Sequence, residues 1–369
     1  MLSYLRNYKF KNYKIKLIIY VVILTIIGIL VIGSANQDYQ SKQIIGFVIG
    51  IVVMVVVSLI DYDFILNFHW VYYVAGCVML VLVLIFGTTV GGATRWIDLG
   101  IRFQPSELCK ILLILFFSRY LMVYEDDINK PKRLLITIAL AAVPLFLILR
   151  EPDLSTTIVT FLIIFSLMFI AGLSAKIVAI FFGVTIPSIG ILLLLVMRKG
   201  QTILSEYQGL RILAWLRPED YPESAYQQQN SIMAIGSGQF LGKGLYNNSV
   251  DSVKNGNYIS EPQTDFIFAV SGEELGFIGS VIIVLLLLAI VIECIAIGRK
   301  AKDLSGKLIC MGMACFVGYQ SFVNICVVTG LMPNTGLPLP FLSYGLTSLV
   351  TLYIGIGLVL NVGLQSKKY

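Results

Sequence analysis

Long apolar runs separated by short polar connections make up most of this chain. Ten of these runs have about the 20 residues that a helix needs to cross a bilayer, or nearly so. The pattern predicts an all-α polytopic membrane protein with about ten transmembrane helices and both termini on one side. One long extramembrane loop, residues 198–264, follows the seventh helix. The runs cover residues 17–34, 44–60, 68–86, 106–124, 134–149, 155–173, 176–197, 266–298, 308–331 and 341–364.

Basic residues are distributed unevenly between the two sides of the predicted bundle. Residues 1–16 form a basic arm with five lysines and arginines, and the other segments on the same side hold ten more. Because cytoplasmic loops are enriched in these residues, we expect both termini to be cytoplasmic and the long loop to be extracellular. The short loops on the other side hold only Lys42, Arg95, Arg102 and Arg150.

The composition excludes several classes of protein. With 57% hydrophobic and 13% charged residues, the 369-residue chain does not resemble a soluble domain. The net charge of +6 does not indicate nucleic-acid binding, because the basic residues gather at the membrane edges. The six cysteines lie in apolar runs without C-x-x-C spacing, so we interpret them as small buried hydrophobic residues.

Residues 260–279 close the long polar loop and open an apolar helix. Acids at membrane depth cost roughly 2.5–3.5 kcal/mol each, so they require an explanation. A helix that begins near Asp265 would carry three glycines on one face, where a backbone or a ligand can approach closely. The simpler alternative is that Asp265 caps the helix. The acids are Asp265, Glu273 and Glu274, and the glycines are Gly272, Gly276 and Gly279.

Charged residues recur in two other connections on the predicted outer side. Arg95 lies in the loop 87–104, and the turn after the fifth helix contains Asp153. The fourth helix begins with a proline, and Glu107 and Lys110 are three residues apart on one of its faces, where they can pair. A self-neutralising pair at a helix end and a solvated turn are the simpler alternatives.

Two further segments contain glycine or proline in unusual numbers. The long loop contains Arg211 and then Gly236 and Gly238, whose backbone amides can approach a phosphate, although a flexible turn is the simpler interpretation. Three prolines forbid a regular helix in residues 332–345. Irregular backbone at membrane depth is tolerated where it is buried in protein or lines a cavity. Together these segments predict an outward-facing cavity lined by carboxylates and cations.

Four motifs in chain order carry a resemblance to a known family. They are RWIDLGIRFQPSEL at 95–108, AIGSG at 234–238, QTDFIFAVSGEELG at 263–276 and GLPLPFLSYG at 336–345. These motifs resemble the SEDS family of RodA, FtsW and SpoVE proteins, and their wording is closer to RodA. The resemblance spans almost the whole chain and implies a single SEDS-type membrane domain over residues 1–369. Two departures are Cys109, where alanine is usual, and Leu346, where the family usually has a second glycine.

The resemblance implies a peptidoglycan glycosyltransferase of the bacterial cytoplasmic membrane. Such an enzyme polymerises lipid II into glycan strands carried on undecaprenyl pyrophosphate, at the outer face, for cell elongation and shape. Its implied partners are a class B penicillin-binding protein that cross-links the product and other membrane proteins of the elongation complex. The residue that corresponds to the family's essential aspartate is Asp265.

The chemistry of this reaction assigns roles to the outer residues. A carboxylate at the acceptor hydroxyl would act as general base, and Asp265 is the candidate. Cations would stabilise the leaving pyrophosphate, and Arg95, Lys110 and Arg211 are available for this. Glu107 and Asp153 would orient the cations or help to hold a divalent ion such as Mg²⁺ or Mn²⁺, which the sequence leaves open. The other candidates for substrate contacts are Ser231, Gly236, Gly238, Thr264 and Glu274.

Three alternative functions share some of these features. A lipid II flippase would also need a polar cavity, but alternating access would place polar residues along the whole depth of the bundle, and the cytoplasmic halves of the helices are largely apolar. A non-catalytic scaffold would leave the acid at position 265 unexplained. A division or sporulation paralogue of the FtsW or SpoVE type is not distinguished from an elongation protein by these residues.

Overall fold

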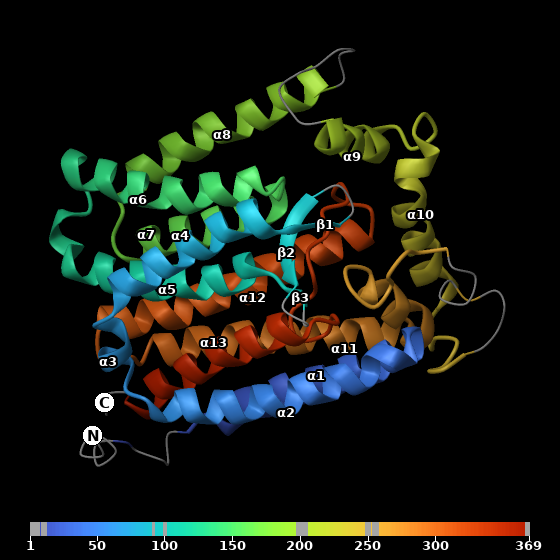
Figure 1. The fold of residues 1–369 in the computed structure, drawn as a ribbon, viewed down its shortest axis with the longest axis horizontal. Coiled ribbons are helices and arrows are strands. Elements are labelled where there is room, and N and C mark those ends of the chain that lie inside the picture. The colour runs from blue at the N-terminus through green and yellow to red at the C-terminus, as the bar shows by residue number, and fades with distance from the viewer. Residues whose placement is uncertain are drawn as a thin grey trace.

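A computed structural model describes residues 8, 13–90, 93–98, 102–196, 206–247, 252 and 258–365. Within these residues the chain forms a bundle of long helices (Figure 1). The elements are α1 (Ile15–Ala35), α2 (Gln37–Leu59), α3 (Tyr62–Leu66), α4 (His69–Phe86), β1 (Thr88–Val90), β2 (Ala93–Asp98), β3 (Arg102–Phe103), α5 (Pro105–Val123), a 3₁₀ turn (Glu125–Asp127), α6 (Pro131–Arg150), α7 (Leu154–Ile170), α8 (Ala175–Val196), α9 (Glu206–Leu216), α10 (Pro222–Ser237), α11 (Ile267–Gly298), α12 (Leu304–Val328) and α13 (Leu346–Leu364).

The helices occupy the predicted apolar runs. In the described part of the chain, eight helices are long and apolar enough to cross a membrane: α1, α2, α4, α6, α8, α11, α12 and α13. The other two runs are helical as well, since α5 has 19 residues and α7 has 17 residues. The prediction of an all-α polytopic membrane protein is therefore confirmed, apart from a small sheet described below.

Some helix boundaries differ from the predicted ones. α2 begins at Gln37 and not at residue 44, because the Asn36 side chain accepts a hydrogen bond from the Asp38 backbone N–H (3.1 Å) and caps a polar first turn. α13 begins at Leu346 and not at residue 341, because the proline-rich segment before it is irregular. Apolar composition placed these residues at membrane depth, but capping and proline decided where the helices begin.

Two predicted loops contain secondary structure. Residues 88–103 form an antiparallel sheet of order β1-β2-β3, in which Thr88 is paired with Trp96. The long loop contains α9 and α10. Contacts with the rest of the bundle hold these two helices in place. The indole Nε1 of Trp215 donates to the Gly330 carbonyl (2.8 Å), and Gln228 Nε2 donates to the Val327 carbonyl (2.7 Å). No local periodicity predicted these elements, because distant residues stabilise them.

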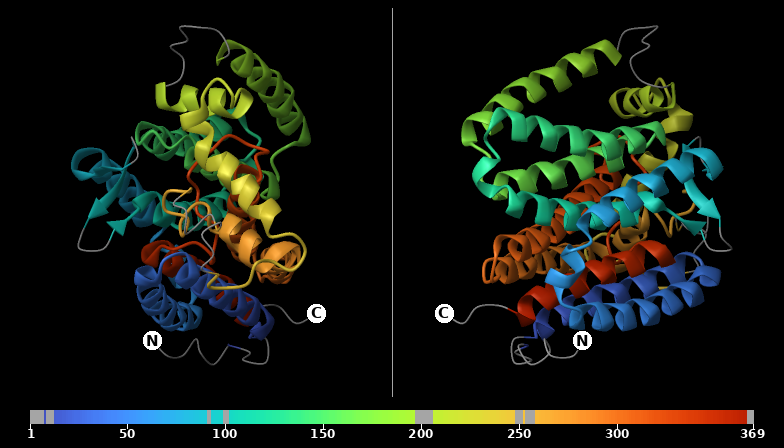
Figure 2. Two further views of the ribbon diagram at one scale, coloured as in Figure 1. Left: turned by 90° about the vertical axis from the view of Figure 1, so that its right-hand side faces the viewer. Right: turned by 60° about the vertical axis from the view of Figure 1, so that its left-hand side comes forward.

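α5, α12 and α13 form the centre of the bundle, and α8 lies at its edge (Figure 2). Most of α5 is buried among α4, α7 and α12. Glycines bring α2 and α13 close together. A β-carbon added at Gly357 would lie 2.7 Å from the Met54 carbonyl oxygen, and one at Gly50 would lie 2.6 Å from the Tyr353 ring. The six cysteines are free and buried or half-buried, as predicted.

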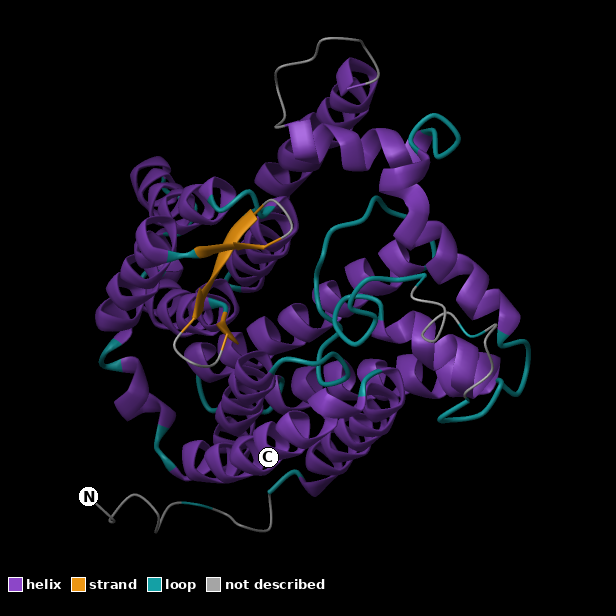
Figure 3. Ribbon diagram, turned by 45° about the vertical axis from the view of Figure 1, so that its right-hand side comes forward, coloured by secondary structure: helices purple, strands orange, loops and turns teal. Residues whose placement is uncertain are grey.

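The two ends of the bundle differ in character. α1 begins and α13 ends at one end, where the Asn361 amide donates to the Tyr8 hydroxyl (3.0 Å). The opposite end carries α9, α10 (Figure 1), the sheet, whose strands stand out in Figure 3, and the irregular residues 331–345. The polar connections that the sequence assigned to one side of the membrane therefore do gather at one end of the molecule.

The predicted glycine face on α11 is interrupted, which corrects one expectation. α11 begins at Ile267, and its N-cap residue is Phe266, so Asp265 does not cap it. Gly276 has non-helical dihedrals (φ 66°, ψ −164°) that break the helix. The three glycines therefore do not share one regular helical face, and the break lies well beyond Asp265.

Candidate active site

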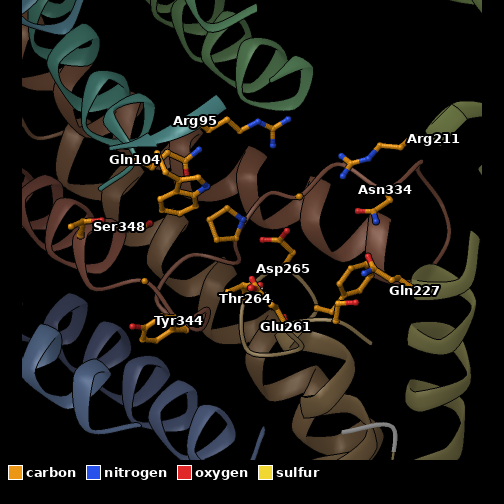
Figure 4. Close-up of a pocket in the computed structure, with 17 residues that line it drawn as sticks. Arg95, Gln104, Arg211, Gln227, Glu261, Thr264, Asp265, Asn334, Tyr344 and Ser348 are labelled. Atoms are coloured by element: carbon orange, nitrogen blue, oxygen red, sulfur yellow. Dashed lines mark hydrogen bonds between the residues drawn. The ribbon is translucent and has the colours of Figure 1, made fainter. Parts of the chain in front are cut away.

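A cavity of about 360 Å³ opens at the end of the bundle that carries the sheet. Its walls come from β2, α9, α10, the turn before α11, the irregular segment 331–345 and the first turn of α13. Arg95 and Arg211 approach it from different elements, and Asp265 lies between them on the wall (Figure 4). Residues far apart in the sequence therefore bring one carboxylate and two guanidinium groups to a single cavity.

Asp265 is held by its backbone, and its side chain is left open to the cavity. The Asn324 side-chain amide of α12 donates to the carbonyls of Asp265 (2.7 Å) and Leu337 (2.6 Å), which ties the turn before α11 to the irregular segment. The carboxylate has no hydrogen-bond partner among the described residues. A β-carbon at Gly336 (φ 74°) would lie 3.2 Å from Asp265 Oδ2 and 3.7 Å from Arg95 Nη1, so glycine keeps the space between these groups free.

The cavity changes the acidity of Asp265. Burial raises the pKa of this carboxyl to about 6, and the nearby guanidinium groups of Arg211 and Arg95 oppose the increase. The group therefore stays mainly ionised at neutral pH, yet it binds a proton far more readily than an exposed aspartate. That combination suits a general base.

Arg95 is oriented by the turn between α6 and α7. Its Nη2 donates to the Pro152 carbonyl (2.7 Å), and its Nε lies 3.4 Å from Asp153 Oδ2. Asp153 also accepts a hydrogen bond from the Thr156 backbone N–H (3.0 Å) and so caps α7. Asp153 is not among the residues that line the described cavity, and it lies behind Arg95 as the residue that positions it.

Glu107 and Lys110 form the predicted pair, but they do so outside the cavity. Lys110 Nζ lies 2.7 Å from Glu107 Oε1 and 2.5 Å from Gln320 Oε1, and both charged side chains are almost fully buried. Gln320 in turn donates to the Pro338 carbonyl (3.0 Å). The pair is thus attached to the segment that forms the cavity wall, while neither member lines the cavity in the described structure. Lys110 does not share the position of the two arginines.

Of the other residues that the sequence suggested as substrate contacts, one lines the cavity and four do not. Thr264 lines the cavity beside Asp265, whereas Ser231 of α10 donates to the Val328 carbonyl (2.6 Å) and is fully buried between helices. Gly236, Gly238 and Glu274 are also not among the described residues that line the cavity. Glu274 instead accepts a hydrogen bond from the Ser34 hydroxyl of α1 (2.6 Å).

Several cavity residues were not singled out from the sequence. Some of them, such as Trp96, Gln104 and Tyr344, lie inside the recognised motifs, so the motifs contained a usable signal. Glu261 and Gln227 come from the long loop, and no local pattern distinguishes them from its other polar residues. The cavity wall also includes Asn334, Thr347 and Ser348.

The described residues contain no group of three or more His, Cys, Asp or Glu side chains that could hold a metal ion. The cavity itself offers the carboxylates of Asp265 and Glu261. Mg²⁺ is commonly held by one or two carboxylates together with substrate phosphates. The residues present therefore fit a divalent ion only as one shared with a phosphate-bearing substrate.

Comparisons with known proteins agree on one family. Residues 13–368 match the family described as "Cell cycle protein", that of FtsW, RodA and SpoVE. A Geobacter sulfurreducens protein named "Probable peptidoglycan glycosyltransferase FtsW" is 34% identical over 97% of this chain and 96% of its own length. Thermus thermophilus RodA, a rod shape determining protein, has a TM-score of 0.70 at 25% identity, covering 97% of this chain and 98% of that chain.

A second solved structure is more similar in shape. It belongs to a study of a peptidoglycan synthase complex that coordinates polymerization and crosslinking. Its chain has a TM-score of 0.80 and 26% identity, covering 95% of this chain and 97% of that chain. The family match over residues 13–368 spans every segment that lines the cavity.

Proposed function

Because the chain belongs to the family of FtsW, RodA and SpoVE cell cycle proteins, we propose that it is a peptidoglycan glycosyltransferase that polymerises lipid II. The names of its curated relatives support this class of enzyme. The cytoplasmic membrane, cytoplasmic termini and an outward-facing cavity are parts of the same proposal, and the distribution of basic residues supports them.

The observation that carries the proposal is the open carboxylate of Asp265 in a cavity shared with Arg95 and Arg211. Asp265 accepts the proton of the acceptor sugar hydroxyl as that oxygen attacks the anomeric carbon of the donor. The bond from this carbon to the diphosphate oxygen breaks, and the diphosphate leaves with the bonding electrons. Arg95 and Arg211 bind the charge that develops on the diphosphate.

The finer role in the cell follows from different observations. The wording of the motifs at 95–108 and 263–276 supports a role in elongation and shape. The curated relatives named FtsW support a role in division as the second candidate. Depletion of the protein distinguishes them, because loss of an elongation enzyme gives round cells and loss of a division enzyme gives filaments.

A transpeptidase is the proposed partner. The structural neighbour comes from a complex that coordinates polymerization and crosslinking, and this supports a class B penicillin-binding protein beside the present chain. A glycan polymerase needs such a partner because polymerisation alone leaves the strands uncrosslinked.

Asp265→Asn is the test of this function, with Glu261→Gln as the matched control. Both variants replace a carboxylate in the same cavity with its amide. Loss of a general base lowers the rate by about 10²–10⁴-fold. We therefore expect Asp265→Asn to abolish glycan strands from lipid II on a gel and Glu261→Gln to retain them, with unchanged folding of both.

Polymerisation by Asp265→Asn at the wild-type rate would refute the general-base role. The wild-type protein could instead make no polymer with its partner but move lipid II between the leaflets of a vesicle. That result would replace the glycosyltransferase proposal with the flippase alternative.

A further inference from the structure

The break in α11 at Gly276 is repaired by a turn from another part of the chain. We call residues 238–244, which follow α10, the inserted turn. Backbone N–H groups of Phe277 and Ile278 donate to carbonyls of the inserted turn (2.9 and 3.3 Å), and N–H groups of the turn donate to the carbonyls of Glu273 and Glu274 (2.9 and 3.0 Å). Unsatisfied backbone groups are costly at membrane depth, so the inserted turn completes the hydrogen bonding of a broken membrane helix.

Glycines make this backbone-to-backbone contact possible. A β-carbon at Gly238 would lie 2.0 Å from the Gly272 carbonyl oxygen, and one at Gly242 would lie 2.2 Å from the Glu274 carbonyl oxygen. At Gly276 a β-carbon would lie 2.3 Å from the Gly242 nitrogen. The glycine-rich motif that suggested phosphate binding in the sequence therefore packs against α11.

The inserted turn has a polar side and an apolar side. On the polar side, Lys243 Nζ lies 2.8 Å from Glu273 Oε1. On the apolar side, Phe240 and Leu241 are 62% and 77% exposed. Exposed apolar side chains that belong to a larger contiguous patch mark a surface that contacts lipid or protein.

The apolar side continues an exposed apolar strip of the membrane helix α11. The ring of Phe240 stacks on that of Phe277, with centroids 6.0 Å apart. Phe277 is itself exposed at the start of an apolar strip on the membrane helix α11. That strip continues along α11 through Ile278, Ile282, Leu285, Leu288 and Ile292, all exposed.

We propose that the inserted turn is seated in the lipid bilayer, with Phe240 and Leu241 among the acyl chains at the headgroup boundary. The occupant of this surface is lipid, because the surface is continuous with the lipid-facing strip of α11. Phenylalanine and leucine side chains on the apolar face of an interfacial segment bury at the boundary between headgroups and acyl chains. α10 precedes the inserted turn directly (Figure 1) and carries Gln227 to the cavity wall (Figure 4), so the bilayer anchors one wall of the cavity at a fixed depth.

The depth of the inserted turn can be measured with a fluorescent label. Leu241→Cys, labelled with the environment-sensitive dye NBD, is compared in liposomes with Leu285→Cys on the lipid-facing strip and Glu219→Cys on the exposed turn between α9 and α10. The wild-type chain, treated identically, corrects for its six buried or half-buried cysteines.

We expect the label at Leu241 to be quenched by a nitroxide on the lipid chain, as at Leu285, and to be protected from aqueous iodide. The label at Glu219 should show the reverse. Iodide quenching at Leu241 equal to that at Glu219 would place the inserted turn in water and overturn the proposal. Protection from both quenchers would mean that protein, such as a second copy of the chain, covers the surface, which also overturns it.

Discussion

Two groups of charged residues lie near each other at one end of the bundle, and they differ in one respect. Glu107 and Lys110 satisfy each other at 2.7 Å, and both are buried. Asp265 shares a cavity with Arg95 and Arg211, but its carboxylate has no hydrogen-bond partner among the described residues. The first group is closed and the second is open to a ligand.

The difference shows why sequence spacing alone misleads about function. A pair three residues apart on a helix neutralises itself locally, and the structure completes it with Gln320. An acid whose nearest cations come from β2 and α9 has no local partner, so its charge remains available. The open group should therefore control activity, and the closed pair should control stability.

Breaking the closed pair should have the largest effect on stability. Removing one member of a buried ion pair costs about 3–5 kcal/mol, because the other charge is left buried and alone. We expect Lys110→Met to lower the unfolding temperature strongly and the double variant with Glu107→Gln to recover part of the loss. Lys130→Met is the matched control, since its ion pair with Asp127 has the same i,i+3 spacing but is exposed, so its loss should matter less. Inactive Lys110→Met protein with unchanged stability would move Lys110 into the active site.

Changing the cations of the open group should alter the pH dependence of catalysis. In the wild type, kcat/KM should fall as the pH decreases through about 6, where Asp265 takes up a proton. Arg211→Gln removes the strongest opposing charge, so the pKa of Asp265 rises and the fall moves to higher pH. Loss of a preorganised charge should also cost on the order of 10²-fold in kcat.

Arg95→Gln is the comparison for this experiment. Arg95 lowers the pKa of Asp265 less than Arg211 does. The pH at which kcat/KM falls should therefore move less in Arg95→Gln than in Arg211→Gln. The variant should also be less stable, because Asp153 loses its ion pair. If kcat/KM falls over the same pH range in the wild type, Arg211→Gln and Arg95→Gln, the group that takes up the proton is not Asp265.

The smallest effect is expected at Glu151, in the turn that orients Arg95. This side chain is fully buried, and neither carboxylate oxygen has a hydrogen-bond partner within the described residues. Burial, assisted by Asp153, raises its pKa from 4.5 to about 8. Between these values the folded state binds a proton that the unfolded state releases, so stability should fall as the pH rises from 4.5 to 8.

Glu151→Gln tests this expectation because its amide cannot ionise. The unfolding temperature of the variant, measured from pH 5 to pH 9, should decline less than that of the wild type. Parallel curves for the two proteins would show that Glu151 does not remain protonated in the folded state.

Much of the fold could be predicted from windows of the sequence. The ten apolar runs are helical over most of their length, because the hydropathy of about 20 consecutive residues is a local property. The start of α13 at Leu346 and the helices α9 and α10 were missed, since prolines and contacts such as Trp215 with Gly330 determine them.

The sequence by itself determined the membrane helices, the family, and the pairing of Glu107 with Lys110, because each depends on composition, motif order or spacing within one helix. Only the tertiary structure decided that Arg95, Arg211 and Asp265 share a cavity and that Lys110 does not. It also decided that the glycines of the inserted turn pack against the break at Gly276. These are contacts between elements distant in the chain, and no local pattern encodes which elements meet.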